Sequence, residues 1–77
     1  MNQYWQAHIS ADPKVMFGKP VIKGTRIPVE LILEKLALGE TPEHLLTAYP
    51  RITRQDITAC LFFAVHSVKK DLVFAVA

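Results

Sequence analysis

Side chains that can hydrogen-bond to nucleic-acid bases gather between residues 51 and 58 of the chain: Arg51, Thr53, Arg54, Gln55 and Thr58. An arginine can bind the edge of guanine through two hydrogen bonds, and a glutamine can bind adenine in the same way. Such contacts require the side chains to lie at the N-terminal end of a helix that enters the major groove. We therefore expect these five residues to touch DNA, with Arg54 reading guanine and Gln55 reading adenine.

The alternative interpretation gives this stretch no specific function: Arg54 and Gln55 are then ordinary solvated residues of a first helical turn, where polar side chains are common. The charge distribution leaves both interpretations open. The net charge is +2, made up of +3 over residues 1–28 and −1 over residues 29–77. Most of the basic surface is therefore expected in the N-terminal segment, which permits DNA binding without requiring it.

The other reactive side chains do not form a recognisable site. Residues 23–25 place lysine before glycine, the reverse of the order in a phosphate-binding loop. Cys60 lies in an apolar helical pattern and is interpreted as a small core residue. Neither serine is accompanied by a base and an oxyanion donor, so we expect no enzyme. Three histidines are far apart and lack metal-ligand spacing, so no metal and no cofactor are predicted; they are His8, His44 and His66.

The helix that must carry residues 54–58 has a clear start signal. Thr53 and Asp56 have the spacing of a capping box, in which each side chain accepts a hydrogen bond from the other residue's backbone N–H. The apolar pattern predicts that this third helix continues to about Lys70. Its expected core stripe is Ile57, Cys60, Leu61, Ala64 and Val68.

Two shorter helices are predicted before it. Residues 29–38 repeat apolar side chains at helical spacing, and Gly39 stands where a helix commonly ends. The main apolar face is expected to hold Val29, Ile32, Leu33 and Leu36, with Leu31 and Leu38 on a second buried flank. Thr41 and Pro42 signal the start of a second helix, which must end before Pro50. Its expected inner face is Leu45, Leu46 and Tyr49.

The N-terminal segment, residues 1–28, is expected to be rich in β-structure. Loose alternation over residues 4–9 predicts a strand, and a turn, a short strand at Val21-Ile22 and a second turn follow. Pro28 is expected in the first turn of the first helix. Arg26 has two interpretations, a phosphate contact or a structural group that caps helix carbonyls, and the second is preferred. The residues that shape this hairpin-like segment are Gly18, Pro20, Gly24, Arg26 and Pro28.

Three stretches together resemble a small prokaryotic family known as domain of unknown function 433. They are Gly-Lys-Pro-Val-Ile-Lys-Gly-Thr-Arg-Ile-Pro-Val at residues 18–29, Leu-Gly-Glu-Thr-Pro-Glu at residues 38–43, and the Tyr-Pro…Thr…Asp-Ile pattern of residues 49–57. The likeness spans roughly Ile9 to Ala64. It implies a homeodomain-like helix-turn-helix core and an antitoxin-like protein paired with a PIN-type ribonuclease toxin, repressing its own operon.

Taken together, the patterns predict one mainly α-helical domain over residues 1–77: a β-rich segment (1–28), a helix-turn-helix core (29–70) and an apolar tail (71–77). A chain of this size gains stability by oligomerising, so we expect a homodimer. Expected interface residues are Tyr4, Trp5, Phe62, Phe63, Leu72, Val73 and Phe74.

The tail has two candidate roles: it either closes the dimer or, as the family resemblance implies, docks the toxin. No apolar run is long enough to cross a membrane, and the N-terminus lacks the features of a signal peptide, so a cytoplasmic location is expected.

Overall fold

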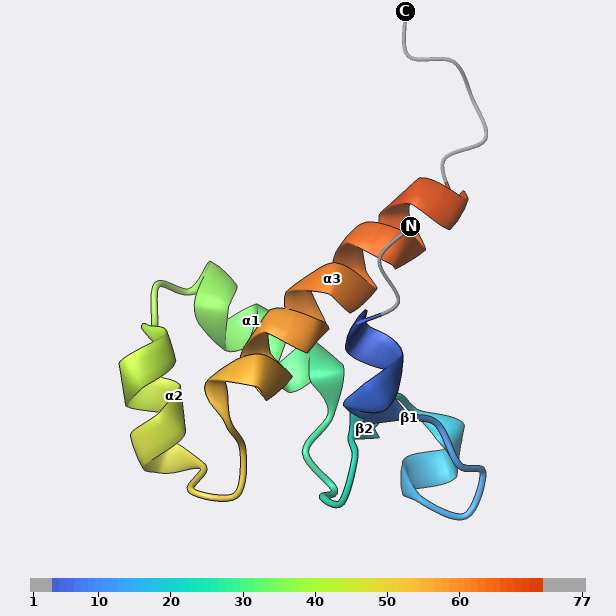
Figure 1. Ribbon diagram of the computed structural model, residues 1–77, viewed down its shortest axis with the longest axis horizontal. Coiled ribbons are helices and arrows are strands. Elements are labelled where there is room, and N and C mark those ends of the chain that lie inside the picture. Colours follow the sequence, from blue (N-terminus) through green and yellow to red (C-terminus); the bar gives the residue numbers. More distant parts are fainter. Residues whose placement is uncertain (1–3, 72–77) are drawn as a thin grey trace, which may run out of the picture.

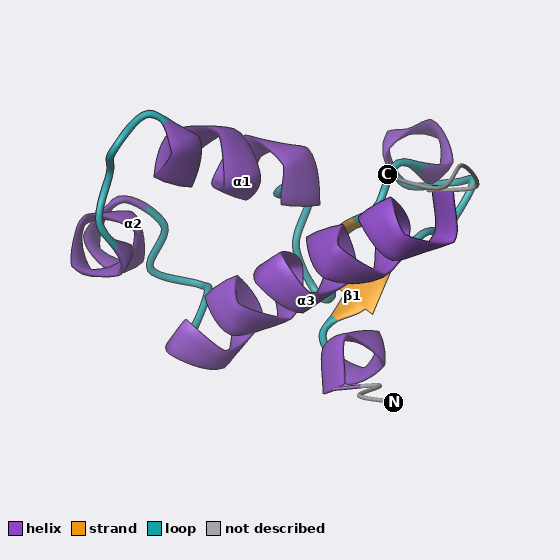
Figure 2. Cartoon of the chain, turned by 90° about the horizontal axis from the view of Figure 1, so that it is seen from above, coloured by secondary structure: helices purple, strands orange, loops and turns teal. Residues whose placement is uncertain are grey.

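The computed structural model describes residues 4–71, in which a two-stranded antiparallel hairpin is followed by three α-helices (Figure 1). The fold class expected from the sequence is thereby confirmed for the single chain. The elements are η1 (Tyr4–Ala7), β1 (Ile9–Ser10), η2 (Met16–Gly18), β2 (Val21–Ile22), α1 (Val29–Ala37), α2 (Pro42–Ala48) and α3 (Arg54–Asp71). Figure 2 shows α2 at one end of the molecule, where it links α1 to the start of α3. The expected tail residues Leu72, Val73 and Phe74 lie outside the described residues.

The hairpin is short, and part of the strand predicted over residues 4–9 is wrong. β1 pairs with β2 through Ile9 opposite Ile22 and Ser10 opposite Val21, whereas residues 4–7 form a 3₁₀ turn. The amide of His8 donates to the carbonyl of Trp5 at 3.0 Å, the i to i+3 bond of such a turn. The loose alternation of aromatic and polar residues fits both conformations, and packing of the turn on α3 decides between them.

The connection between β1 and β2 contains one turn of left-handed backbone. The positive φ expected at Gly18 is confirmed at 83°, and it extends back to Met16 and Phe17, with φ of 51° and 59°. Bulky side chains seldom adopt this region because Cβ crowds the following carbonyl. The side chain of Phe17 is fully exposed, so no burial offsets the strain at that residue.

The helices begin and end close to where the local signals place them. The hydroxyl of Thr41 accepts a hydrogen bond from the amide of His44 at 3.1 Å, which caps α2 as predicted. Gly39 follows α1 with φ of 96°, the left-handed conformation expected after a helix end. Pro28 lies one position earlier than predicted: it is the N-cap of α1, in extended backbone, and Val29 is the first helical residue.

The core lies where β2, α1, α2 and α3 meet. The fully buried side chains include Ile22, Ile32, Leu45 and Cys60, and the structure buries no polar or charged residue within residues 4–69. The predicted inner faces of α1 and α2 are confirmed, because Leu33, Leu36, Leu46 and Tyr49 pack against this core. The second buried flank expected on α1 is wrong at its end: Leu38 is 76% exposed, since α1 has already ended there.

Burial predicts a sharp contrast between two aliphatic residues near α1. Ile32 is completely buried, so Ile32→Ala removes apolar contacts and leaves a cavity that should lower the free energy of unfolding by about 2–5 kcal/mol. Leu38→Ala is the matched control, and its effect should stay within about 0.5 kcal/mol because the side chain is solvated. Urea denaturation followed by circular dichroism measures both. Equal effects of the two substitutions would contradict the core described above.

Candidate nucleic-acid interface

The start of α3 is held by the predicted capping box. The amide of Thr53 donates to Asp56 Oδ2 at 2.9 Å, and the amide of Asp56 donates to Thr53 Oγ1 at 3.2 Å. Both side chains therefore satisfy backbone donors that a helix start leaves unpaired. This fixes the rotation of the first turn, and with it the direction in which the following side chains point.

The candidate DNA-binding residues lie together and are all solvent-exposed: Arg51, Thr53, Arg54, Gln55 and Thr58. Arg54 and Thr58 are four residues apart and so share one face of α3. Gln55 lies beside that face, and Arg51 and Thr53 belong to the connection between α2 and α3. The structure thus brings the five residues to one end of α3.

Arg54 is engaged in an ion pair. Its Nη2 lies 2.5 Å from Glu43 Oε2 of α2, and this hydrogen bond is the main reason why the pKa of the Glu43 carboxyl is lowered. Both side chains are more than half exposed. Exposed pairs of this kind contribute little to stability, so the guanidinium can exchange Glu43 for another acceptor at small cost.

Arg51 joins the helical core to the hairpin, a contact that sequence reasoning missed. Its Nη2 donates to the carbonyl of Gly24 at 2.9 Å, across 27 positions of sequence. The preferred interpretation of Arg26, as a group that caps helix carbonyls, is wrong: its exposed guanidinium has no hydrogen-bond or ion-pair partner among residues 4–71. The two arginines have similar surroundings in the sequence, because each lies in a polar loop, and only the fold distinguishes them.

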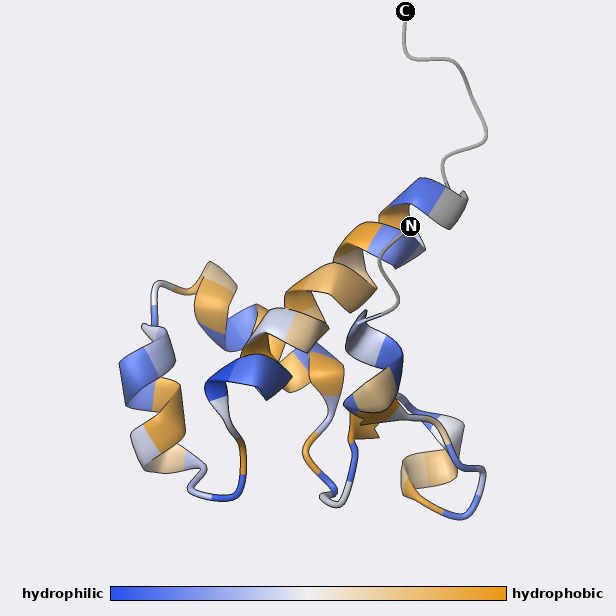
Figure 3. Ribbon diagram, in the orientation of Figure 1, coloured by the Kyte–Doolittle hydropathy of each residue, from blue (hydrophilic) through white to orange (hydrophobic). Residues whose placement is uncertain are grey.

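The basic side chains without an acidic partner are concentrated along one edge of the molecule. Figure 3 shows hydrophilic residues at the tips of the connections that end there, β2 to α1 and α2 to α3. The connection from β1 to β2 reaches the same edge (Figure 1). The cations of these three connections that lack an ion pair within the described residues are Lys14, Lys23, Arg26 and Arg51. Most carboxylates are paired elsewhere: Glu30 with Lys19, Glu40 with Lys35 and His44, Glu43 with Arg54, and Asp56 with His8.

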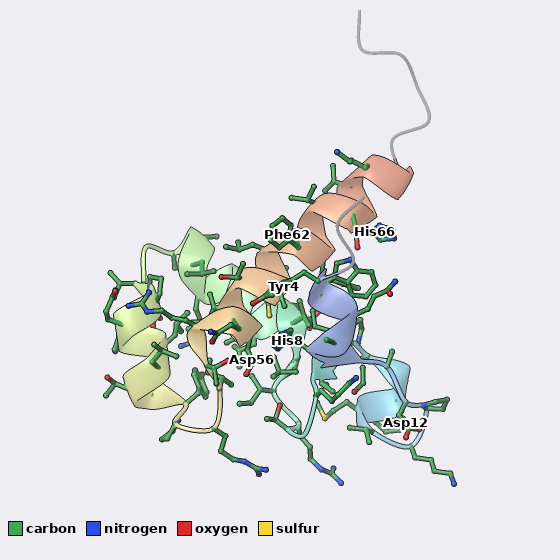
Figure 4. All side chains as sticks on the ribbon, in the orientation of Figure 1. Tyr4, His8, Asp12, Asp56, Phe62 and His66 are labelled. Carbon is green, nitrogen blue, oxygen red and sulfur yellow. The ribbon has the colours of Figure 1, made fainter. Side chains whose placement is uncertain are left out.

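A second side of α3 is covered by η1. His8 Nδ1 lies 2.9 Å from Asp56 Oδ1, and the Tyr4 hydroxyl donates to the carbonyl of Gln55 at 3.3 Å. The Tyr4 ring packs edge-on against Phe62, with centroids 5.9 Å apart, and Figure 4 shows Asp56, His8, Tyr4 and Phe62 following one another along α3. The anchoring of η1 therefore leaves the Arg54 and Thr58 face of α3 open.

The expected interface aromatics pack within one chain. The Trp5 ring lies 5.0 Å from Phe63 and 5.3 Å from His66, centroid to centroid, so η1 covers the aromatic face of α3. A part played by Tyr4, Trp5, Phe62 and Phe63 in a dimer interface stays a prediction.

The apolar face of α3 that stays exposed is not the aromatic face covered by η1. The core stripe predicted for α3 is correct at Ile57 and Cys60 but wrong at two positions. Leu61 and Val68 are 47% and 56% exposed, and Val65 between them is 45% exposed. These three side chains continue the helical face that starts with Arg54 and Thr58, because the five positions follow at intervals of four, three, four and three. We call Leu61, Val65 and Val68 the apolar stripe.

Cys60 is buried at the centre of the core. Burial raises the pKa of its thiol to about 12, with a smaller contribution from the negative charge of Asp56.

No group of three histidine, cysteine or acidic side chains suited to a metal ion occurs in the described part of the chain. Among the same residues, no helix combines the length and the apolar character that crossing a membrane requires.

Known proteins resemble the chain in sequence and in fold. A family model described as "Protein of unknown function (DUF433)" matches residues 9–64, which confirms the resemblance seen in the sequence. The uncharacterized protein y4eO of Sinorhizobium fredii is 30% identical over 56 residues, 73% of this chain and 25% of that protein. An uncharacterized protein of Archaeoglobus fulgidus is 84% identical over 19 residues, 25% of this chain and 53% of that protein. The chain thus spans about a quarter and about half of these relatives.

The fold has a counterpart among solved structures. The crystal structure of a DUF433 member from Anabaena variabilis superposes with a TM-score of 0.77 at 29% sequence identity, covering 88% of this chain and 67% of that one.

The burial of Cys60 predicts that its thiol is inert in the folded protein. Its raised pKa keeps the thiolate scarce at pH 8, and the thiolate is the form that reacts with disulfide reagents such as DTNB. We expect negligible labelling of the native chain over an hour and full labelling in 6 M urea. Rapid stoichiometric labelling without denaturant would contradict the buried position.

Proposed function

The chain belongs to the DUF433 family, described as proteins of unknown function, and we propose that it is a helix-turn-helix protein that binds duplex DNA. The observation that carries this proposal is the exposed polar face at the start of α3. Because a fold alone does not define a function, the proposal depends on those side chains and on the charge beside them.

The arrangement at α3 suits reading of base edges in the major groove. Arg54 and Gln55 stand in the first turn of the second helix of the α2–α3 pair, where recognition helices make their base contacts. Arg54 is assigned to guanine, Gln55 to adenine, and Thr58 to a base or phosphate on the same face. Thr53 and Arg51, just before the helix, are placed to contact the sugar-phosphate backbone.

In the unbound protein, Glu43 competes with DNA for the Arg54 guanidinium. The Glu43 carboxylate pairs with the Arg54 guanidinium, which would otherwise bind guanine, and its negative charge repels phosphates. Binding would therefore exchange one charge-assisted hydrogen bond for a bidentate pair with the base. Since the protein pair is exposed, its loss costs little.

We further propose that the protein acts as a homodimer on a two-fold symmetric site. The apolar stripe supports this, because three large aliphatic side chains exposed along one helix face suit contact with a second chain. Helix-turn-helix dimers present two recognition helices about one helical turn of DNA apart.

The family resemblance supports the finer assignment to an antitoxin-like repressor of its own operon that neutralises a PIN-type ribonuclease. In such a pair the toxin would dock on surfaces away from the α3 start. The alternative is a dimeric interaction module without nucleic-acid binding, and the same apolar stripe favours it, because protein contact alone would account for that surface.

DNA binding separates these two functions. We expect fluorescence anisotropy to show binding to the duplex upstream of the protein's own gene, weakening steeply as salt rises because phosphate contacts release counterions. The Arg54→Ala, Gln55→Ala double variant should lose preference for that duplex over unrelated DNA, since each base contact contributes about 1–3 kcal/mol of discrimination. Absence of salt-dependent binding to any duplex by the native chain would favour the interaction module.

Removal of the competing carboxylate should strengthen binding. Glu43→Gln frees the Arg54 guanidinium and deletes one negative charge near DNA, so we expect the affinity for the same duplex to rise by roughly threefold to tenfold. Glu34→Gln makes the same charge change at an exposed position of α1 that has no ion pair among the described residues. An equal gain from both substitutions would indicate a net-charge effect and contradict the role given to Glu43.

A further inference from the structure

A hollow of about 540 Å³ opens on the edge of the molecule next to the start of α3. Three segments far apart in sequence form it: the end of β1 with the loop that follows, the turn after β2, and the connection from α2 to α3. Figure 1 shows these connections reaching the same edge. The residues that line it are Ser10, Asp12, Val15, Val21, Gly24, Thr25, Arg26 and Arg51.

Two guanidinium groups give the hollow its chemistry. Arg51 is held in place, because one of its nitrogens donates to the Gly24 carbonyl at 2.9 Å, and its remaining donors stay available. Arg26 has no partner among residues 4–71, so all five of its donors are free to bind a ligand. Planar guanidinium groups match the oxygen geometry of carboxylates and phosphates.

Two other polar side chains of the hollow already make hydrogen bonds within the chain. The Thr25 hydroxyl donates to the Ile22 carbonyl and accepts from the Ile27 amide. Asp12 is the single carboxylate of the lining, and its Oδ1 accepts the Lys14 amide at 2.9 Å. The free hydrogen-bonding capacity of the site is therefore mainly that of donors, which calls for an anion.

The position of the hollow indicates which anion. Arg51 precedes Arg54 by three residues, so the hollow adjoins the residues that would read bases. Two of the three segments that line it also carry Lys14 and Lys23, neither of which has an ion pair within the described residues. A strand of nucleic acid that meets the start of α3 would run its backbone past this edge, whereas an enclosed pocket would be expected for a small metabolite.

We propose that the hollow is a phosphate-binding site, formed by Arg26 and Arg51, that takes a backbone phosphate of the DNA bound by α3. This rests on the proposed function and adds the surface that sets the register of the protein on the duplex. The hydrogen bond from Arg51 to Gly24 makes the hairpin turn and the helix-turn-helix one binding unit.

The first test measures the salt dependence of DNA binding. Arg26→Ala should weaken binding to the cognate and to unrelated duplexes by the same factor, about tenfold. It should also make the negative slope of log K against log salt shallower by about 1, because one phosphate contact is lost. Lys69→Ala, which removes one exposed cation from the other end of α3, is the control and should leave the slope unchanged. Arg26→Lys should recover the slope but not the full affinity, because it keeps the charge without the guanidinium fork.

The second test does not depend on DNA binding. Inorganic phosphate is titrated against chloride at equal ionic strength while the backbone amides are followed by NMR. We expect saturable shifts at Gly24, Thr25 and Arg26 that the Arg26→Ala variant does not show.

The outcomes distinguish the two proposals. If the native chain binds DNA while Arg26→Ala and Lys69→Ala lower the slope equally or not at all, the phosphate site is overturned and the proposed function stands. If the native chain binds no duplex, the proposed function fails and the assignment of the hollow to a DNA phosphate fails with it; saturable phosphate shifts would then leave only a site for free phosphate. If phosphate shifts these amides no more than chloride does at equal ionic strength, the hollow binds neither a DNA phosphate nor free phosphate.

Discussion

The carboxylate of Asp56 connects the two parts of this small protein. One of its oxygens accepts the Thr53 amide and sets where α3 begins, and the other lies 2.9 Å from His8 Nδ1 at the end of the N-terminal turn. The side chain is only 13% exposed, so both contacts are partly shielded from water. Because one group carries both contacts, the rotation of α3 and the docking of η1 depend on each other. That rotation decides which side of α3 packs on η1, which packs in the core and which faces solvent.

The features predicted correctly from the sequence are those decided by neighbours along the chain. The Thr53 and Asp56 capping box, the Thr41 cap and the left-handed glycine after α1 each involve residues within a few positions. The apolar faces of α1 and α2 follow from helical spacing and end in the core as expected. Such local signals fix helix boundaries because the unpaired backbone groups at helix ends must find nearby partners.

The features that were missed depend on distant parts of the chain. Whether residues 4–7 form a strand or a turn is decided by packing of Tyr4 and Trp5 on Phe62 and Phe63, each 58 positions later in the sequence. That packing covers Phe62 and Phe63 and leaves Leu61 and Val68 exposed, the opposite of what the apolar pattern of α3 alone indicates. A hydrogen bond to a backbone carbonyl was likewise expected of Arg26 but is made by Arg51, because only the folded chain brings Arg51 to the Gly24 carbonyl. For the candidate site, the residues of α3 could be named in advance, but their connection to the hairpin could not.

The uneven pairing of charges also has a consequence at a distance. Each ion pair is close to neutral from a few ångströms away, so the long-range field comes mainly from side chains without an ion pair. At the edge near the start of α3 these are four cations and one carboxylate, Asp12. A molecule with this asymmetry has a dipole moment directed toward that edge. In the field of a polyanion it experiences a torque that turns the edge forward during diffusion, before any contact forms. The distribution of charge would therefore raise the rate of productive encounters, and ions in the medium would reduce that advantage over a length of about 8–10 Å.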